Sequence, residues 1–517
     1  MEDTSRTHNS IRNLFFSFGG KAIDILMKFV IRTVFVYTLT KEYLGLSGFF
    51  SNILSFLSLA ELGVGTAITF SMYKPIAEND EHQISILMNV YRKAYIGIGI
   101  AVLILGSLLT PFLPFFIDNM PDIPHIDLIY LLFVLNSGIS YFYSYKSSLI
   151  SAYQKNYIVT NNTYIFNVIT GITQIFILYA THNYILYLVV QVIFTFLSNV
   201  VISHIADKMY PYIKKKVTDK LDTTTKNTIL SNVSALVFQK LGTTIVFSTD
   251  NLLLTKMFGL IIVGLYSNYS LLISAIESII YQCFNAISAS VGNLNATAEV
   301  EHQKEVFYKI FFINYWIIAF STIAFAVLLQ PFVTLWLGDD FLMPVLCVIF
   351  IVLNFYIKGM RNSASIFDNS YGLMSYNKFV PIPECIINIV ASIALGYLVG
   401  PAGIFIGTTV STVFTSLWRE PYVLFKYGFH SSQRKYWFKY FEYFLLTIVM
   451  YVVTAGTAHM IPLSSIFLTV IVRIILVVII PNLMIAVLFH RTEEYQYFKG
   501  LVIGLIHKKK KSSLKEE

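Results

Sequence analysis

Four charged residues lie within one apolar stretch near the start of the chain. Lys21, Asp24, Lys28 and Arg32 fall inside the run Ile11–Tyr37, which is long enough to cross the roughly 30 Å hydrocarbon core of a bilayer as a helix. At roughly 100° per residue, the three cations lie within about 40° of one another, with Asp24 beside them. Each Lys or Arg near a helix centre costs roughly 2.5–3.5 kcal/mol on insertion scales, so this face must meet other helices or water. The pattern predicts one wall of a cavity that receives an anion.

Ion pairing within the helix is the alternative interpretation of these residues. Asp24 is three residues after Lys21 and four before Lys28, and both spacings allow a pair on one helix face. Pairing with one carboxylate neutralises one cation and leaves a net charge near +2.

Two later apolar segments carry similar faces. Lys240 and Asp250 lie in the segment 229–256, and Lys358, Arg361 and Asp368 lie in the segment 342–369. The last three residues share an arc of about 80° by the same helical arithmetic. A shared central cavity explains all of these faces, whereas a pair between Arg361 and Asp368 across two turns explains only the last.

Other polar residues have two interpretations each. Glu61 either hydrogen-bonds across helices or carries a coupling proton, a role also open to Asp368. Lys146 either snorkels to the membrane interface or guides a phosphate into the cavity. The residues expected to bind substrate are Lys21, Asp24, Lys28, Arg32, Lys146, Lys240, Asp250, Lys358 and Arg361.

Catalytic and metal-binding patterns are absent from the sequence. There is no GxSxG, P-loop or HExxH motif, and the three cysteines lie singly in apolar segments without metal-ligand spacing. We therefore expect no catalytic residues, no metal and no cofactor, and a protein that is not an enzyme.

The composition is that of a membrane protein. Hydrophobic residues make up 56% of the chain and charged residues 13%, against about 25% charged residues in soluble proteins. The sequence predicts an all-α polytopic protein with about fourteen spans of bilayer length.

Orientation follows from the basic residues. On a model with both termini inside, nearly all Lys and Arg outside the spans are cytoplasmic, and the outward loops hold only Lys41 and Lys256. The net charge of +8 therefore reflects membrane orientation and gives no reason to expect nucleic acid. We expect a multi-pass protein of the cytoplasmic (plasma) membrane.

An internal repeat indicates two lobes. Residues 77–83 and 298–303 share an Ala-Glu start and a Glu-His-Gln end, and Gly45-Leu46 matches Gly264-Leu265 near the start of the preceding spans. The expected divisions are a six-helix lobe (1–206), a basic cytoplasmic linker (207–228), a second six-helix lobe (229–427), two additional spans (428–490) and a basic amphipathic tail (491–517).

Several motifs together resemble a known family. They are Arg32-Thr33, Tyr43–Leu46, Leu59–Gly63, Ser71–Asp80, Tyr145–Leu149 and Gln239–Thr244. The chain resembles the polysaccharide-transport branch of the MOP exporter superfamily, which includes the Wzx-type flippases of O-antigen and capsule pathways.

The resemblance implies a MATE-like core of twelve helices in two lobes, plus two C-terminal helices, in a bacterial membrane. It also implies alternating access for an undecaprenyl-diphosphate-linked oligosaccharide, which moves from the inner to the outer leaflet. Polymerases or glycosyltransferases of the same pathway are the implied partners. By that analogy Lys21, Asp24, Lys28, Arg32, Lys240 and Arg361 line the cavity.

Three alternatives stay open. A cation-coupled multidrug exporter shares the fold, but its substrates favour carboxylates where the first span here is net positive. A lipid II flippase shares both the fold and an anionic lipid-linked substrate. A membrane glycan polymerase or ligase needs acceptor-binding surface, and the outward loops here are short.

Overall fold

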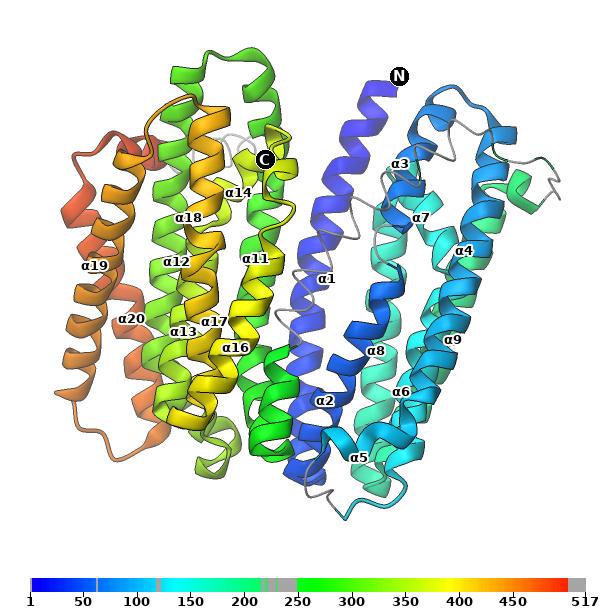
Figure 1. Ribbon diagram of the computed structural model, residues 1–517, viewed down its shortest axis with the longest axis horizontal. Coiled ribbons are helices and arrows are strands. Elements are labelled where there is room, and N and C mark those ends of the chain that lie inside the picture. Colours follow the sequence, from blue (N-terminus) through cyan, green and yellow to red (C-terminus); the bar gives the residue numbers. More distant parts are fainter. Residues whose placement is uncertain are drawn as a thin grey trace, which may run out of the picture. The chain divides into compact units, whose positions relative to one another are not determined.

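The computed structural model describes residues 2–61, 64–117, 122–214, 219, 221, 229 and 249–500 (Figure 1). Side chains are described from Gly19 onward within these ranges, apart from those of residues 59, 60, 66, 286, 289 and 375. Helices connected by short turns make up nearly all of this part, and it contains no strand. The chain forms two compact units, Met1–Ser267 and Asn268–Glu517, which are described separately below.

The first unit is built from long helices and a few short ones. In order they are α1 (Glu2–Thr38), α2 (Lys41–Leu57), α3 (Val64–Ala77), α4 (Glu81–Leu108), α5 (Leu113–Phe116), α6 (Ile126–Tyr141), α7 (Ser144–Ala152), α8 (Asn156–Thr181) and α9 (Tyr184–Met209). The first turns of α11 (Leu260–Thr297) also belong to this unit. Helix α1 packs along α8, α4 packs along α6, and α9 packs against both α6 and α8.

Glycines let α1 approach α8 closely. A Cβ at Gly20 of α1 would overlap the ring of Tyr164 on α8, and a Cβ at Gly171 of α8 would press on Met27 and Ile31. Small residues at such positions allow helix backbones to approach within a membrane, where apolar surface alone gives little drive for association. The packing brings the charged residues of α1 against polar residues of α8.

The two glycines of the predicted repeat meet in the structure. Gly45 on α2 faces the start of α11, where a Cβ would lie 2.0 Å from the carbonyl oxygen of Leu260. A Cβ at Gly264 would in turn lie 3.0 Å from the backbone nitrogen of Gly45. The absence of side chains at these two glycines lets the backbones of α2 and α11 approach closely. The division into lobes at residue 228 stays a prediction, since much of the segment 229–248 lies outside the described residues.

The second unit contains the later helices. They are the rest of α11, α12 (Val300–Leu337), α13 (Val345–Met360), α14 (Asn362–Ser370), α15 (Met374–Asn377), α16 (Pro381–Val399), α17 (Ala402–Phe414), α18 (Ser416–Val423), α19 (Arg434–His459) and α20 (Ile466–Phe489). Helix α12 contacts α13, α19 and α20, and α17 packs along both α16 and α13.

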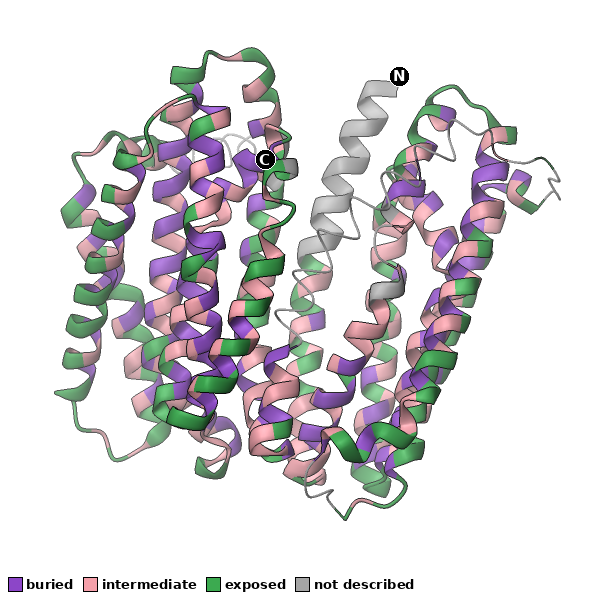
Figure 2. Cartoon of the chain, in the orientation of Figure 1, coloured by how far each residue is buried: buried purple, intermediate pink, exposed green. Residues whose placement is uncertain are grey.

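Aromatic residues form the core around α12. Phe307, Phe311 and Tyr315 are fully buried, and Tyr315 stacks on Tyr443 of α19 with ring centroids 4.0 Å apart. Figure 2 shows buried residues along α12 and α13, whereas α19 and α20 expose much of their surface. The two C-terminal helices therefore cover this aromatic core.

Two helices of the second unit are broken near charged residues. Helix α13 ends at Met360 and α14 begins at Asn362, and the buried amide of Asn314 donates to the carbonyl oxygens of Gly359 (3.0 Å) and Met360 (3.3 Å). The second break lies at Thr415, between α17 and α18. In a membrane, freed backbone groups must find partners within the protein, and Asn314 supplies them at the first break.

The described helices are suited to a bilayer. Nine of those within the described ranges are long and apolar enough to span a membrane, and the bent pair α6–α7 raises the number to ten. Many large apolar side chains are exposed, Tyr397, Leu398 and Phe438 among them, as lipid-facing residues are. The chain is an all-helical multi-pass membrane protein. Helix α1 is outside the nine, and the predicted span 229–256 falls mostly outside the described residues.

Candidate functional site

One buried carboxylate organises the charged residues of α1. Asp24 is 5% exposed and pairs with Lys21 (3.4 Å) and Lys28 (3.0 Å) through the same oxygen, Oδ2. Its other oxygen accepts a hydrogen bond of 3.0 Å from the amide of Asn167 on α8. The pairing of Asp24 with both lysines, which the spacing allowed, is present. The two lysines differ in exposure, with 23% of the Lys21 side chain and 56% of the Lys28 side chain accessible.

Arg32 lies one helical turn beyond Lys28. Its guanidinium donates a 2.9 Å hydrogen bond to Ser267 Oγ on α11 and lies near the hydroxyl groups of Tyr184 and Tyr187. Among the side chains that the structure describes, no carboxylate pairs with Arg32. A serine hydroxyl satisfies one donor and leaves the positive charge in place.

The α1 cluster, defined as Lys21, Asp24, Lys28 and Arg32, has a net charge of +2, from three cations and one carboxylate. Phosphate suits both the exposed ammonium and the guanidinium of Arg32, which has no carboxylate partner within the described part of the chain. The planar fork of the guanidinium matches two phosphate oxygens. The arrangement can hold an anion.

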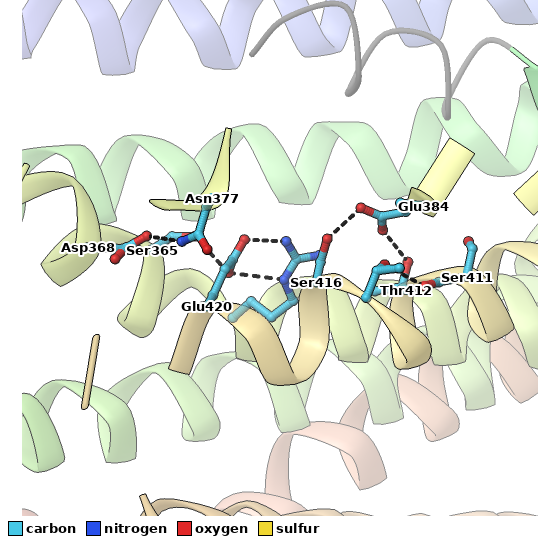
Figure 3. A network of polar contacts seen from close by, with 10 residues as sticks. Ser365, Asp368, Asn377, Glu384, Ser411, Thr412, Ser416 and Glu420 are labelled. Atoms are coloured by element: carbon cyan, nitrogen blue, oxygen red, sulfur yellow. Dashed lines mark hydrogen bonds and ion pairs between the residues drawn. The ribbon is translucent and has the colours of Figure 1, made fainter. Parts of the chain in front are cut away.

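The charges of the second unit are arranged differently. Arg361, at the break between α13 and α14, forms an ion pair with Glu420 of α18 through Nε and Nη2, with the Nε contact at 3.2 Å. Ser365 Oγ donates to the same carboxylate at 3.1 Å (Figure 3). Both charged side chains are less than one-fifth exposed. The alternative interpretation, a pair between Arg361 and Asp368, is not what forms. Arg361 pairs instead with Glu420, which lies outside the segment 342–369, and Asp368 accepts from Asn377.

Two further carboxylates lie in the same polar network. Glu384 of α16 accepts from Thr412 (3.1 Å) and Ser416 (2.5 Å), and Asp368 accepts from Asn377 at 2.6 Å (Figure 3). The second-unit network, defined as Arg361, Asp368, Glu384 and Glu420, thus has one cation and three carboxylates. The hydroxyl and amide donors around these carboxylates stabilise negative charge.

Lys358 contacts a different helix from Arg361. Its ammonium lies 3.0 and 3.1 Å from the two carboxylate oxygens of Glu277 on α11. It lies on a helix turn adjacent to Arg361, yet the two cations contact different helices. The three residues of the predicted face therefore contact three different helices: Lys358 contacts α11, Arg361 contacts α18 and Asp368 contacts α15. Each of the two cations has a carboxylate partner.

The remaining predicted residues are placed as follows. Lys146 has 14% of its side chain exposed, pairs with Asp207 (2.7 Å) and donates to Ser203 (2.8 Å), both on α9. It is therefore held by partners within the protein instead of snorkelling. Glu61 accepts a 2.6 Å hydrogen bond from the hydroxyl of Tyr95, which is the cross-helix bond expected for it. Asp250 is buried and engaged, and Lys240 lies outside the described residues.

Sequence reasoning missed the partners of these charges. Glu277, Glu420, Asn167 and Asp207 were not identified as candidates, and Glu384 had no assigned role. The signal that could have found the carboxylates is general, since an ionisable residue within a span requires a partner. The sequence does not show which one, because the partners are 28 to 143 residues apart.

Comparisons with known proteins fit this architecture. Residues 10–288 match the family described as polysaccharide biosynthesis protein, over more than half of the chain. No curated protein sequence shows significant similarity to the chain.

Solved structures share the fold. The chain is similar to the lipid II flippase MurJ in an inward closed conformation, at 14% identity and TM-score 0.64, over 92% of this chain and 99% of that one. It is also similar to a mutant of the Vibrio cholerae MATE transporter VcmN, at 14% identity and TM-score 0.58, over 82% and 99% of the two chains. An inward-facing MATE family transporter of the MOP superfamily matches at 15% identity and TM-score 0.56, over 78% and 96%. The MATE-like fold predicted from sequence is confirmed.

Proposed function

Because the chain belongs to the polysaccharide biosynthesis protein family, we propose that it is a flippase for an anionic lipid-linked saccharide. The substrate is an undecaprenyl-diphosphate-linked oligosaccharide, such as a repeat unit of O-antigen, capsule or exopolysaccharide. It moves from the inner to the outer leaflet of the bacterial plasma membrane. Flipping breaks and forms no covalent bond, and it requires no catalytic residue.

The net positive α1 cluster is the observation that carries the proposal. Three cations and one carboxylate lie on one helix of a membrane protein, where each unpaired charge is expensive. A bound diphosphate offsets this unfavourable free energy, because its negative charge neutralises the excess positive charge of the cluster. We assign Lys28 and Arg32 to direct phosphate contact, since Lys28 is exposed and no described carboxylate neutralises Arg32.

The other predicted ligands have weaker support. Arg361, Lys358 and Lys146 each have a carboxylate partner, so we give them no part in diphosphate binding. Asp250 and Lys240 stay predictions.

Substitution of Arg32 tests the proposal. Arg32→Ala and Arg32→Glu are expected to abolish export of the lipid-linked saccharide in a bacterial strain that lacks its own polysaccharide flippase. Arg32→Lys keeps the charge and loses the fork, and is expected to retain partial export. Membrane abundance, measured by immunoblot, is expected to stay near that of the wild type.

Arg473→Ala is the matched control. Arg473 lies within α20 and donates to the carbonyl oxygen of Val327, so its removal deletes a membrane-embedded arginine that is not a member of the α1 cluster. Export per molecule is expected to be unchanged. Normal export by an abundant Arg32→Ala protein, or equal loss of export per molecule in both variants, would contradict the proposal.

Two parallel assays distinguish the proposed function from two related ones. Rescue of a strain depleted of its lipid II flippase would identify the substrate as lipid II, the molecule named for the structural relative MurJ. Drug resistance without saccharide export would favour the alternative of a cation-coupled multidrug exporter; one of the similar structures is named a multidrug resistance MATE family transporter.

The proposed orientation places both termini in the cytoplasm. In a variant without Cys283, Cys347 and Cys385, a cysteine at Lys214 should be protected from an impermeant thiol reagent in intact cells, and one at Asp339 should be labelled. Both positions are exposed in the structure. The reverse labelling pattern would overturn the orientation.

A further inference from the structure

A cavity of about 310 Å³ lies in the second unit, among α11, α12 and α13. Its polar lining comes from Glu277, Ser274 and Ser278 of α11, Lys358 of α13 and Asn362 of α14. Its volume is at the lower end of the roughly 300–1,000 Å³ of small-molecule sites. The cavity could hold one small polar unit.

The ion pair at this cavity is partly exposed. The side chains of Lys358 and Glu277 are 49% and 31% accessible, although they belong to membrane-embedded helices. Charged groups within membrane spans face water or protein, because contact with lipid is too unfavourable. A pair this accessible adds little to stability, so stability alone does not account for its presence. Because both side chains are partly exposed, a ligand in the cavity can reach the pair.

The cavity has no net charge to attract a phosphate. One ammonium and one carboxylate sum to zero, and Glu277 repels an anion that approaches Lys358. A group with several hydroxyls fits better, because it donates to the carboxylate and accepts from the ammonium at once. The Asn362 side chain adds an amide donor and acceptor, and the hydroxyls of Ser274 and Ser278 donate to their own helix and keep lone pairs for a ligand.

The rest of the lining is apolar and aromatic. Tyr281 is 66% exposed, and Phe355 and Ile318 form the apolar wall. The electron-rich face of an aromatic ring attracts positively polarised C–H groups such as those on one face of a sugar ring. Few polar groups on an apolar lining are typical of sites that orient one ligand.

We propose that this cavity binds an uncharged sugar unit of the transported glycan through the Glu277–Lys358 pair. The inference rests on the proposed function, because it assigns the saccharide part of that substrate. It makes Glu277, Lys358 and Asn362 determinants of glycan specificity, with no role in phosphate binding.

Binding by the purified full-length protein in detergent tests the inference. The probes are undecaprenyl diphosphate alone and the same lipid carrying N-acetylglucosamine or galactose. We expect the wild type to bind at least one glycosylated lipid about tenfold more tightly than the bare lipid. Glu277→Gln with Lys358→Gln should remove this preference and leave the affinity for the bare lipid unchanged. Arg32→Ala should weaken binding of all three probes.

Glu301→Gln with Lys304→Gln is the matched control, since it removes an exposed ion pair of the same unit outside the cavity. It should preserve the preference for sugar, and melting temperatures check that each variant is folded. An unchanged sugar preference in the Glu277/Lys358 double variant, or no preference in the wild type, would overturn the inference. Failure of the wild type to bind any of the lipids would instead refute the proposed function.

A cavity-filling variant separates sugar from lipid chain. Ser278→Phe should weaken binding of the glycosylated lipid only, if the cavity holds sugar. Equal weakening of the bare lipid would show that the cavity holds the prenyl chain, and would also overturn the inference.

Discussion

The α1 cluster and the second-unit network differ in the sign of their excess charge. The α1 cluster has three cations for one carboxylate, whereas the network around Arg361 has one cation for three carboxylates. The sequence showed a similar cationic face in both segments, since the partners of Arg361 and Lys358 come from other helices. A cation in a membrane helix therefore indicates an anion site only when the neighbouring helices leave it unneutralised.

The second-unit network can hold an excess of carboxylates because hydrogen-bond donors surround them, whereas the excess cations of the α1 cluster lack such compensation among the described residues. Glu384 and Glu420 accept from Thr412, Ser416, Ser365 and Arg361, so their charges are stabilised within the protein. Arg32 has a serine hydroxyl instead, which accepts one hydrogen bond and adds no charge. We therefore expect the second-unit network to serve structure and the α1 cluster to serve binding.

The largest expected effect is loss of the folded protein on breaking the Arg361–Glu420 pair. Arg361→Ala leaves a buried carboxylate uncompensated, and removing one partner of a buried pair costs about 3–5 kcal/mol. The fraction of monodisperse protein in size-exclusion chromatography and the melting temperature should both fall. Arg361→Met with Glu420→Met should recover much of this loss, because it removes both charges.

Lys358→Met provides the contrast within the same helix pair. Its partner Glu277 is partly exposed, so the stability loss should be much smaller. A stable Arg361→Ala protein that has lost export would contradict the structural role of Arg361 and would assign it to substrate binding, the role proposed for the α1 cluster.

The next largest expected effect is the loss of stability when the close contact between Gly45 and α11 is overpacked. Gly45→Ala places a Cβ 2.0 Å from the carbonyl oxygen of Leu260, so the two backbones must separate. Overpacking of this kind costs roughly 1–3 kcal/mol. Since Ser267 is on the same helix as Leu260, the change should also loosen the hydrogen bond to Arg32.

Gly97→Ala is the control for this substitution. A Cβ at Gly97 of α4 meets no atom within 4 Å, and alanine favours a helix over glycine by up to about 1 kcal/mol. The melting temperature should therefore fall for Gly45→Ala and stay level or rise for Gly97→Ala. Equal melting temperatures of the two variants would contradict the close approach of α2 and α11.

Asp24→Asn is expected to raise the affinity for undecaprenyl diphosphate. The change raises the net charge of the α1 cluster from +2 to +3 and frees both lysines from their shared carboxylate. An increase of about tenfold corresponds to about 1.4 kcal/mol. Binding to purified protein measures the affinity, and an unchanged or weaker affinity would show that Asp24 is needed to position the lysines.

The fold was predictable because it depends on local properties of the sequence. Length and apolarity of segments predicted a helical membrane protein, and the motifs around Gly45 and Ser71–Asp80 predicted the family. The internal repeat that pairs Gly45 with Gly264 stays a prediction, although the two glycines do lie close together.

The site was only partly predictable, because it depends on contacts between distant residues. The alternative interpretation of the α1 charges, in which Asp24 pairs with Lys21 and Lys28, is what forms, because these lysines lie three and four residues away on the same helix. Glu420 is 59 residues from Arg361 and Glu277 is 81 residues from Lys358, so no helical spacing links them. The breaks at Arg361 and Thr415 also interrupt the regular geometry from which the faces were derived.

The smallest expected effect is the difference in ligand affinity between variants of the two lysines that share Asp24. Both form ion pairs with Oδ2, but Lys28 has 56% of its side chain accessible and Lys21 only 23%. A ligand can therefore reach Lys28 directly, whereas Lys21 acts mainly on the charge of Asp24. Lys28→Gln should weaken binding of undecaprenyl diphosphate several-fold, and Lys21→Gln should weaken it about half as much on the free-energy scale, since an ion pair near the surface is worth about 1 kcal/mol or less. Raising the salt concentration should reduce the difference, because screening acts most on exposed charges. Titration of each purified variant at two salt concentrations measures both effects, and a larger loss for Lys21→Gln would place the phosphate on the buried side of Asp24.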